Sequence, residues 1–256
     1  MESPNTVTVD LSLDRGRLKL DAAFQFDSVV VVTGSSGAGK TTLLRVLAGL
    51  DHCDDGHLSV GESVWVSAGA SLPAELRSVG YLSQEGGLFP HMSAVDNVAF
   101  PLIGDRIGRR LRRANATALL DQLGLAEVVD AAVIRLSGGQ RRRVALARAL
   151  AADRSLYLLD EPFAGLDSRS ADLTLNFLGN RLSRLAAPAL IAGHDLLRLS
   201  LLSDRTLRLT GGRIVEPAAD PVLTERGSEG RAHVQARATT RRSTVHTLAD
   251  YRVGSR

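Results

Sequence analysis

The chain has 256 residues and a mass of 27.2 kDa, with 44% apolar and 23% charged residues. This size and balance predict one large α/β domain with a sizeable core, and they exclude a wholly disordered chain. Aromatic residues make up only 4%, too few for the extended base-stacking platform of a single-strand nucleic-acid binder. The one cysteine, Cys53, excludes an internal disulfide framework and a Cys-rich zinc site.

The net charge of +3 is unevenly distributed along the chain. Residues 225–256 hold seven arginines against three acidic residues, which is +4, so residues 1–224 sum to −1. The main body therefore lacks the global basic character of a nucleic-acid binder, and we expect no nucleic-acid partner.

Membrane insertion by this chain itself is not expected. No apolar run approaches the roughly 18–20 residues needed to cross a bilayer. Residues 1–10 lack the basic and apolar regions of a signal peptide. We therefore expect the protein to stay on the side where it is made, with any membrane role arising through a partner.

Three strands are expected near the N-terminus. Apolar residues alternate over 18–26, which predicts a half-buried strand after a first strand at 6–13. The β-branched run at 28–33 predicts a strand buried on both faces. A glycine-rich turn follows it, and residues 42–50 then have helical spacing.

Two later apolar runs, 155–160 and 189–193, also precede sequence compatible with helices. Repetition of strand, turn and helix predicts an α/β fold with a mainly parallel sheet covered by helices.

The region between the N-terminal strands and the run at 155–160 differs in composition. Residues 94–131 are rich in Ala, Leu and Arg, which predicts a helical insert over about 90–138. Residues 225–256 show no sustained period, so we expect a mostly disordered end. The predicted organisation is one domain over 1–217 and a basic tail over 218–256.

A phosphate-binding loop follows the strand at 28–33. Its sequence matches G-x-x-x-x-G-K-[ST] and lies between a buried strand and a helix, as this loop requires. Its amides and the helix N-terminus would face the phosphates, Lys40 would reach the β- and γ-phosphates, and Thr41 would ligate Mg²⁺. The candidate nucleotide ligands are Gly34, Ser35, Ser36, Gly37, Ala38, Gly39, Lys40, Thr41 and Thr42.

The apolar strand at 156–161 ends in two carboxylates. Alone, this pattern fits equally a strand that meets an acidic helix N-terminus. Beside a phosphate loop, it predicts that Asp160 holds the magnesium shell and that Glu161 polarises a water aimed at the γ-phosphate.

Residues 136–140, LSGGQ, open a predicted helix over 141–151. Ser137 is an expected N-cap, and Gly138 and Gly139 leave amides exposed at a second anion-binding helix end. On composition alone, an ordinary capped helix is the better interpretation.

Together these motifs resemble the nucleotide-binding subunit of ATP-binding cassette (ABC) transporters. The similar segments are Walker A at 34–41, the Q-loop at 81–84, the signature at 136–140, Walker B at 156–161, the D-loop at 164–167 and the switch histidine at 193–195. The resemblance implies a P-loop NTPase cassette with an antiparallel β subdomain and a helical subdomain beside the mainly parallel core.

The resemblance also implies a mechanism with ATP and Mg²⁺ as cofactors. Two cassettes, expected to be identical, pack head to tail, so that the signature of one closes on ATP held by the other. Glu161 would act as the base and His194 would contact the γ-phosphate, whereas Gln84 would touch Mg²⁺. The residues implied at the shared nucleotide are Ser137, Gly138, Gly139, Gln140 and Asp167. Without the motif, a histidine at a strand end or a glutamine in a loop is more often structural.

The adenine side departs from the family pattern. Residues 10–17 offer no aromatic ring to stack on the base, so Arg15 or Arg17 is the expected substitute.

The absence of a fused membrane span favours a separate subunit that docks on an integral membrane permease at the cytoplasmic face of the cell membrane. Docking is expected through the Q-loop and the helical subdomain, near residues 86–92. The alternative, equally supported, is that Leu88 and Phe89 pack into the cassette itself.

The transported substrate is suggested only by resemblance. The segment 88–100 and the residues after His194 are similar to the molybdate-importer group, although sulfate, polyamine and iron importers share them. About 40 residues follow Val215, so the oxyanion-binding domain usual at the C-terminus of that group is expected to be absent. A soluble ABC ATPase without a transport role, whose tail binds RNA or acidic lipid, is the other alternative.

Overall fold

The computed structural model describes residues 5–215 except 17, 68, 106 and 204. The predicted tail at 218–256 and Arg17 lie outside the described residues.

Within the described part of the chain, eleven strands form one sheet in the order β6-β5-β4-β1-β2-β11-β10-β3-β9-β8-β7. The strands are β1 (Val7–Asp14), β2 (Lys19–Phe26), β3 (Val29–Thr33), β4 (Asp55–Val60), β5 (Ser63–Ser67), β6 (Ala70–Ser71), β7 (Val79–Leu82), β8 (Leu156–Asp160), β9 (Ala189–Ala192), β10 (Thr206–Thr210) and β11 (Arg213–Val215).

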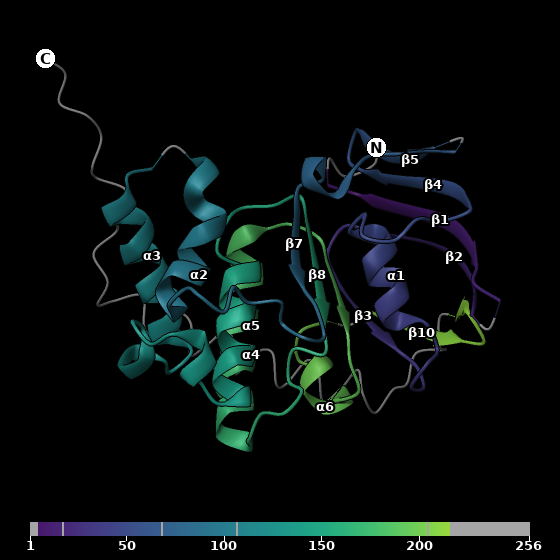
Figure 1. Cartoon of the computed structure of the whole chain (residues 1–256). Coiled ribbons are helices and arrows are strands. Elements are labelled where there is room, and N and C mark those ends of the chain that lie inside the picture. Colours follow the sequence, from purple (N-terminus) through teal and green to yellow (C-terminus); the bar gives the residue numbers. More distant parts are fainter. Residues whose placement is uncertain (1–4, 17, 68, 106, 204, 216–256) are drawn as a thin grey trace, which may run out of the picture.

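The sheet has a parallel part and an antiparallel part, as predicted. Strands β10, β3, β9, β8 and β7 pair in parallel, each with the next. Strands β2, β1, β4, β5 and β6 pair antiparallel and form the group at the right of Figure 1. All five sequence-predicted strands are present within one or two residues of their expected bounds.

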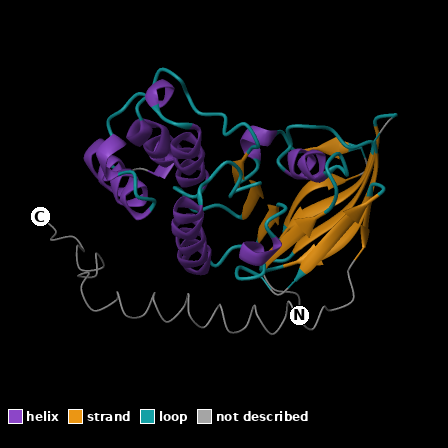
Figure 2. Cartoon of the chain, turned by 90° about the horizontal axis from the view of Figure 1, so that it is seen from below, coloured by secondary structure: helices purple, strands orange, loops and turns teal. Residues whose placement is uncertain are grey.

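Most of the helices gather beside the β7 end of the parallel part, and Figure 2 shows them at the opposite end of the molecule from most strands, whereas a few short helices lie beside the strands. The α-helices are α1 (Lys40–Leu47), α2 (Ala94–Ala99), α3 (Arg109–Gln122), α4 (Gly138–Ala149), α5 (Ser168–Leu185) and α6 (Leu196–Leu199). Short three-ten helices are η1 (Ala74–Leu76), η2 (Phe100–Asp105), η3 (Ala126–Val128) and η4 (Val133–Arg135). None of the helices described is long and apolar enough to span a bilayer.

The parallel strands separate two apolar cores. Successive side chains on a strand point to opposite faces. Val30 and Val32 of β3 therefore pack in the core that contains α1, whereas Val31 packs in the core that contains α4 and α5. Every residue of β8 is buried, as the apolar run over its first four residues predicts for all but Asp160. Figure 1 shows α1 on one side of these strands and α4 and α5 on the other.

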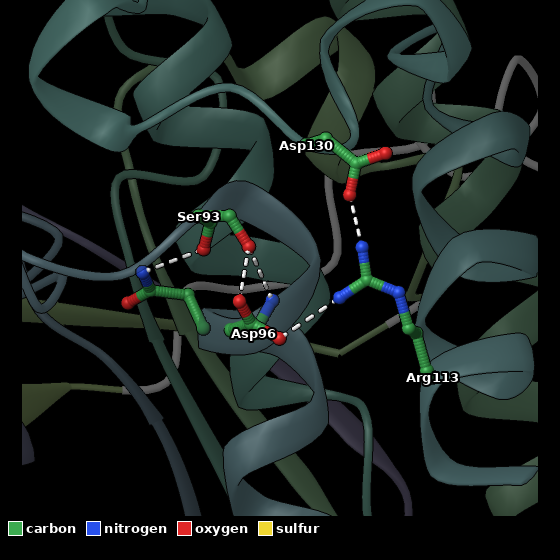
Figure 3. A network of polar contacts seen from close by, with 5 residues as sticks. Ser93, Asp96, Arg113 and Asp130 are labelled. Carbon is green, nitrogen blue, oxygen red and sulfur yellow. Dashed lines mark hydrogen bonds and ion pairs between the residues drawn. The ribbon is translucent and has the colours of Figure 1, made fainter. Parts of the chain in front are cut away.

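Helices α2 and α3 are joined by a polar network at their surface (Figure 3). Ser93 caps α2 by accepting from the Asp96 amide at 3.1 Å, and its hydroxyl donates to the Asp96 carboxylate at 2.6 Å. Arg113 on α3 pairs with Asp96 at 3.0 Å and also with Asp130. The pairing side chains are largely solvated, so each pair contributes about 0–1 kcal/mol, and apolar contacts dominate the helix packing.

Candidate functional site

The phosphate loop connects β3 to α1 through glycines in unusual conformations. Gly34, Gly37 and Gly39 have φ values of 153°, 76° and 105°, which residues with a Cβ rarely adopt. A Cβ on Gly34 would lie 2.4 Å from the carbonyl oxygen of Leu209 on β10. The loop path therefore depends on glycine at this position for space as well as for φ.

The ammonium of Lys40 points back into this loop. Lys40 is 7% exposed, and its Nζ donates to the carbonyl oxygens of Gly34 at 2.8 Å and Ser35 at 3.1 Å. The same Nζ lies 3.4 Å from Nε2 of His194. A buried cation that donates to backbone carbonyl oxygens is a suitable partner for an anion.

Asp160 ends β8 as a buried carboxylate, 1% exposed. Its Oδ2 has no hydrogen-bond partner among the residues described. An unpaired buried oxygen of this kind is costly, and carboxylate oxygens are ligands that Mg²⁺ prefers. The chemistry of Asp160 and of the Thr41 hydroxyl, on α1 that packs against β8, suits a magnesium ion, which these two residues would help to hold. No cluster of three or more His, Cys, Asp or Glu in the described chain offers a full protein cage.

Glu161 and His194 meet at the ends of neighbouring strands. Oε1 of Glu161 lies 3.0 Å from Nε2 of His194. The Glu161 amide donates to the carbonyl of Ala192, the last residue of β9, at 2.8 Å. Glu161 has a φ of 50°, a strained conformation for a residue other than glycine. The structure thus brings together Lys40, Glu161 and His194, three residues singled out from sequence.

The signature segment forms the N-terminus of α4. The Ser137 hydroxyl accepts from the Gln140 amide at 3.2 Å, and the Gln140 side chain accepts from the Ser137 amide at 2.9 Å. This capping box confirms Ser137 as the N-cap. It also starts the helix at Gly138, so the expected start at residue 141 was wrong by three residues. Since α4 and α1 pack on opposite faces of the sheet, their two N-termini belong to different faces.

Two other predicted residues have local contacts in the structure. Asp167 caps α5, accepting from the amide and hydroxyl of Ser170 at 2.9 Å each, and these bonds hold the pKa of Asp167 below its ordinary value. The Gln84 side chain is exposed, and its carbonyl accepts from Arg142 at 2.9 Å. Ligand roles for Asp167 and Gln84 remain predictions.

Sequence reasoning missed two residues at the site. Arg142 is buried beneath Asp160 and Glu161, and the available signal is its helical spacing from the buried Ala145 and Ala149. Leu18 lies at the phosphate loop, because its Cδ1 is 3.2 Å from the place of a Cβ on Gly39.

The structure also gives contacts for residues predicted at the adenine side of the site and just after the Q-loop. Arg15, expected to stack on adenine, donates to the carbonyl of His52 at 2.9 Å, and its stacking role remains a prediction. Leu88 packs against the core beside α4, and the Phe89 ring lies 4.8 Å from that of Phe100. Both side chains therefore pack on the cassette itself, as one of the two alternatives expected, although both remain half-buried.

Comparison with known proteins identifies relatives over most of the chain. Residues 19–164 match the family described as ABC transporter. The molybdenum import ATP-binding protein ModC of Rhodobacter capsulatus is 37% identical over 210 residues, covering 81% of this chain and 56% of that protein. ModC of Mycobacterium tuberculosis is 38% identical over 224 residues, covering 84% of this chain and 60% of that protein. The chain thus spans less than two thirds of these relatives.

A solved structure shares the fold. The dimeric post-hydrolysis structure of the ATP-binding cassette MJ0796 bound to ADP and Pi matches with a TM-score of 0.71 and 23% identity, covering 84% of this chain and 99% of that chain.

Proposed function

The chain belongs to the ABC transporter family, and from this membership we propose that it hydrolyses ATP to energise a membrane importer. The observation that carries the proposal is the meeting of three side chains beyond the ends of β3, β8 and β9, where Nε2 of His194 lies 3.4 Å from Nζ of Lys40 and 3.0 Å from Oε1 of Glu161. Phosphoryl transfer to water needs a cation that holds the phosphates and a polar group that orients the attacking water, and Lys40 and Glu161 can fill these two roles with His194 beside both.

In the proposed reaction, the loop amides and Lys40 hold the triphosphate. Glu161 accepts a proton from, or orients, the attacking water, and His194 holds that water and the γ-phosphate in line. Thr41, Asp160 and Gln84 would hold Mg²⁺, which would supply charge neutralisation on the phosphate oxygens. Catalysis by these residues is mostly positioning and electrostatic stabilisation.

We propose that two copies of the chain act together, head to tail. Ser137 and Gly138 are exposed at the N-terminus of α4, where amides can receive an anion from another molecule. The signature would then close on ATP bound by Lys40 of the second copy. Gly139, Gln140 and Asp167 would line the same shared site.

The proposed substrate is molybdate, since the relatives at 37–38% identity are named molybdenum import proteins. The chain would lie at the cytoplasmic face of the membrane and bind a permease through the Q-loop and helical subdomain. Phe100 and Ile103, 44% and 55% exposed near Phe89, offer apolar surface for that contact. We further propose that 1–217 form the cassette, with the helical subdomain over about 90–138, and that the tail at 218–256 is dispensable for ATPase activity.

The function is tested by measuring cell molybdenum at limiting external molybdate, with and without the gene, and with sulfate and iron as controls. We expect a selective fall in molybdenum that wild-type protein restores and Glu161→Gln does not. Depletion of another solute, such as sulfate, iron or a polyamine, would keep the transport ATPase and reject molybdate. No change in any solute would reject transport in favour of a soluble ATPase.

A purified-protein assay separates the enzymatic step from transport. ATP hydrolysis should depend on Mg²⁺, stop with EDTA and persist in a chain ending at residue 217. Loss of activity on truncation would reject the proposed cassette boundary.

A further inference from the structure

Arg142 of α4 lies under the two strand ends that carry Gln84 and Glu161. It is 7% exposed, although arginine is rarely buried without partners. Its guanidinium donates to four backbone carbonyls, those of Ser83, Gln84, Asp160 and Glu161.

The contacts use every donor of the guanidinium. Nη1 donates to Ser83 at 2.7 Å and Gln84 at 2.9 Å, whereas Nη2 donates to Glu161 at 2.7 Å and also to Asp160. Nε donates to Glu161 at 3.2 Å. Five N–H groups thus make five hydrogen bonds, the full capacity of the side chain. Since β7 and β8 are parallel neighbours, one side chain of α4 ties together the ends of both strands.

Four hydrogen bonds hold the backbone of Glu161 in place. Its φ of 50° places a side-chain-bearing residue in the left-handed region, which persists only when the surroundings determine it. The Glu161 carbonyl accepts twice from Arg142 and once from the Ala164 amide, and the Glu161 amide donates to Ala192. The direction of the Glu161 carboxylate toward His194 follows from this conformation.

We infer that Arg142 is a positioning residue that fixes the Glu161 carboxylate and couples it to the Q-loop and the signature helix. Arg142 acts through the backbone of Glu161 and touches no reacting atom. A shift of the Q-loop at Ser83 and Gln84 is transmitted through the guanidinium to Glu161. This inference rests on the proposed ATPase function for its kinetic consequence, although not for its structural one.

Arg181 provides a matched control for the loss of a buried arginine. It lies on α5, half-buried, and donates to the carbonyls of Leu150 at 2.9 Å and Ala151 at 3.0 Å, just past the other end of α4. Its removal takes away two hydrogen bonds to backbone carbonyls, against five for Arg142, without touching β7 or β8.

The test compares Arg142→Gln, Arg142→Lys and Arg181→Gln in the full-length chain. We expect Arg142→Gln to lower kcat for ATP by about 10- to 100-fold while KM stays within about twofold, since misplacement of a catalytic group by about 1 Å has such effects. Arg142→Lys, which keeps the charge but not the planar fork, should lose nearly as much. Arg181→Gln should lower the melting temperature without changing kcat or KM. A kcat within twofold of wild type for both Arg142 variants, or the same loss for Arg181→Gln, would overturn the inference.

Hydrogen exchange gives a readout that needs no turnover. In Arg142→Gln, or in Arg142→Lys should the first variant fail to fold, we expect faster exchange at 83–87 and at 160–164 together. Unchanged exchange at 160–164 would overturn the positioning role. If the wild-type chain hydrolyses no ATP, the proposed function fails, and this exchange result still decides whether Arg142 holds Glu161.

Discussion

Oε1 of Glu161 and Nε2 of His194 are 3.0 Å apart because the pairing of two strands puts them there. Asp160 on β8 pairs with Ala192 on β9 in parallel register, so Glu161 and His194 lie just beyond the same rung of the sheet. The sheet register, rather than sequence proximity, therefore builds the contact on which the proposed chemistry depends.

Glu161→Gln should keep ATP binding and lower hydrolysis by at least about 100-fold, because general-base steps contribute about 10²–10⁴. The variant should also trap the closed pair of cassettes, detectable as an ATP-dependent dimer by size-exclusion chromatography. Glu62→Gln, in the exposed turn after β4, is the control and should behave as wild type. Wild-type turnover in Glu161→Gln would refute the role of Glu161.

His194→Ala should lower kcat by about 10- to 100-fold with little change in ATP affinity, because it removes a partner of the attacking water. Since Glu161 and His194 are in contact, their effects should not add. We expect the double variant with Glu161→Gln to be no slower than the slower single variant. Multiplication of the two losses would mean that the residues act separately.

The requirement for glycine in the phosphate loop can be tested by adding one methyl group at each of two positions. Gly34→Ala should lower the free energy of unfolding by about 2–4 kcal/mol and weaken ATP binding, because the new Cβ would lie 2.4 Å from the Leu209 carbonyl. Gly37→Ala shares a positive φ but meets nothing within 4 Å, so it should cost only about 1–2 kcal/mol. Urea unfolding and titration with a fluorescent ATP analogue measure both, and equal losses would contradict the steric argument.

The strands that carry the site could be predicted from sequence because they are buried along their length. Val30 to Val32 of β3, Leu156 to Leu159 of β8 and all of β9 are apolar, so hydrophobicity alone marks them. Strands β4 to β6, β10 and β11 are partly exposed, and they are held by pairing with one another and with β1, β2 and β3. Local sequence carries little signal for such strands.

The roles of single residues divide in the same way. Lys40, Glu161 and His194 follow strands that the sequence marks, so their meeting at one sheet edge could be expected. Arg142 stands between two other arginines, Arg141 and Arg143. Arg142 differs from them because it lies on the side of α4 that faces the ends of β7 and β8. That placement depends on how the helix packs on the strands, which the local sequence does not specify.

The ion pair of Arg45 and Asp51 anchors the end of α1, and lowering the pH should weaken it. Nε and Nη2 of Arg45, in the last turn of α1, donate to the two Asp51 oxygens at 2.8 and 2.9 Å. The hydrogen bonds from Arg45 hold the pKa of Asp51 below its ordinary value. A lowered pKa in the folded state means that the stabilisation is complete above the ordinary value of about 4 and is lost as the pH falls through the folded-state pKa.

Asp51→Asn should therefore reduce the free energy of unfolding by up to about 1 kcal/mol at pH 5–7, a modest amount because both side chains are partly solvated. Below about pH 4 the difference from wild type should shrink, since protonation removes the same charge in the wild type. Urea unfolding at pH 7, 5 and 3 measures this difference. Arg45→Gln should give the same pH profile, and the double variant should be no less stable than either single one. A difference that stays constant down to pH 3 would show that the ionised pair contributes nothing to the anchoring of α1.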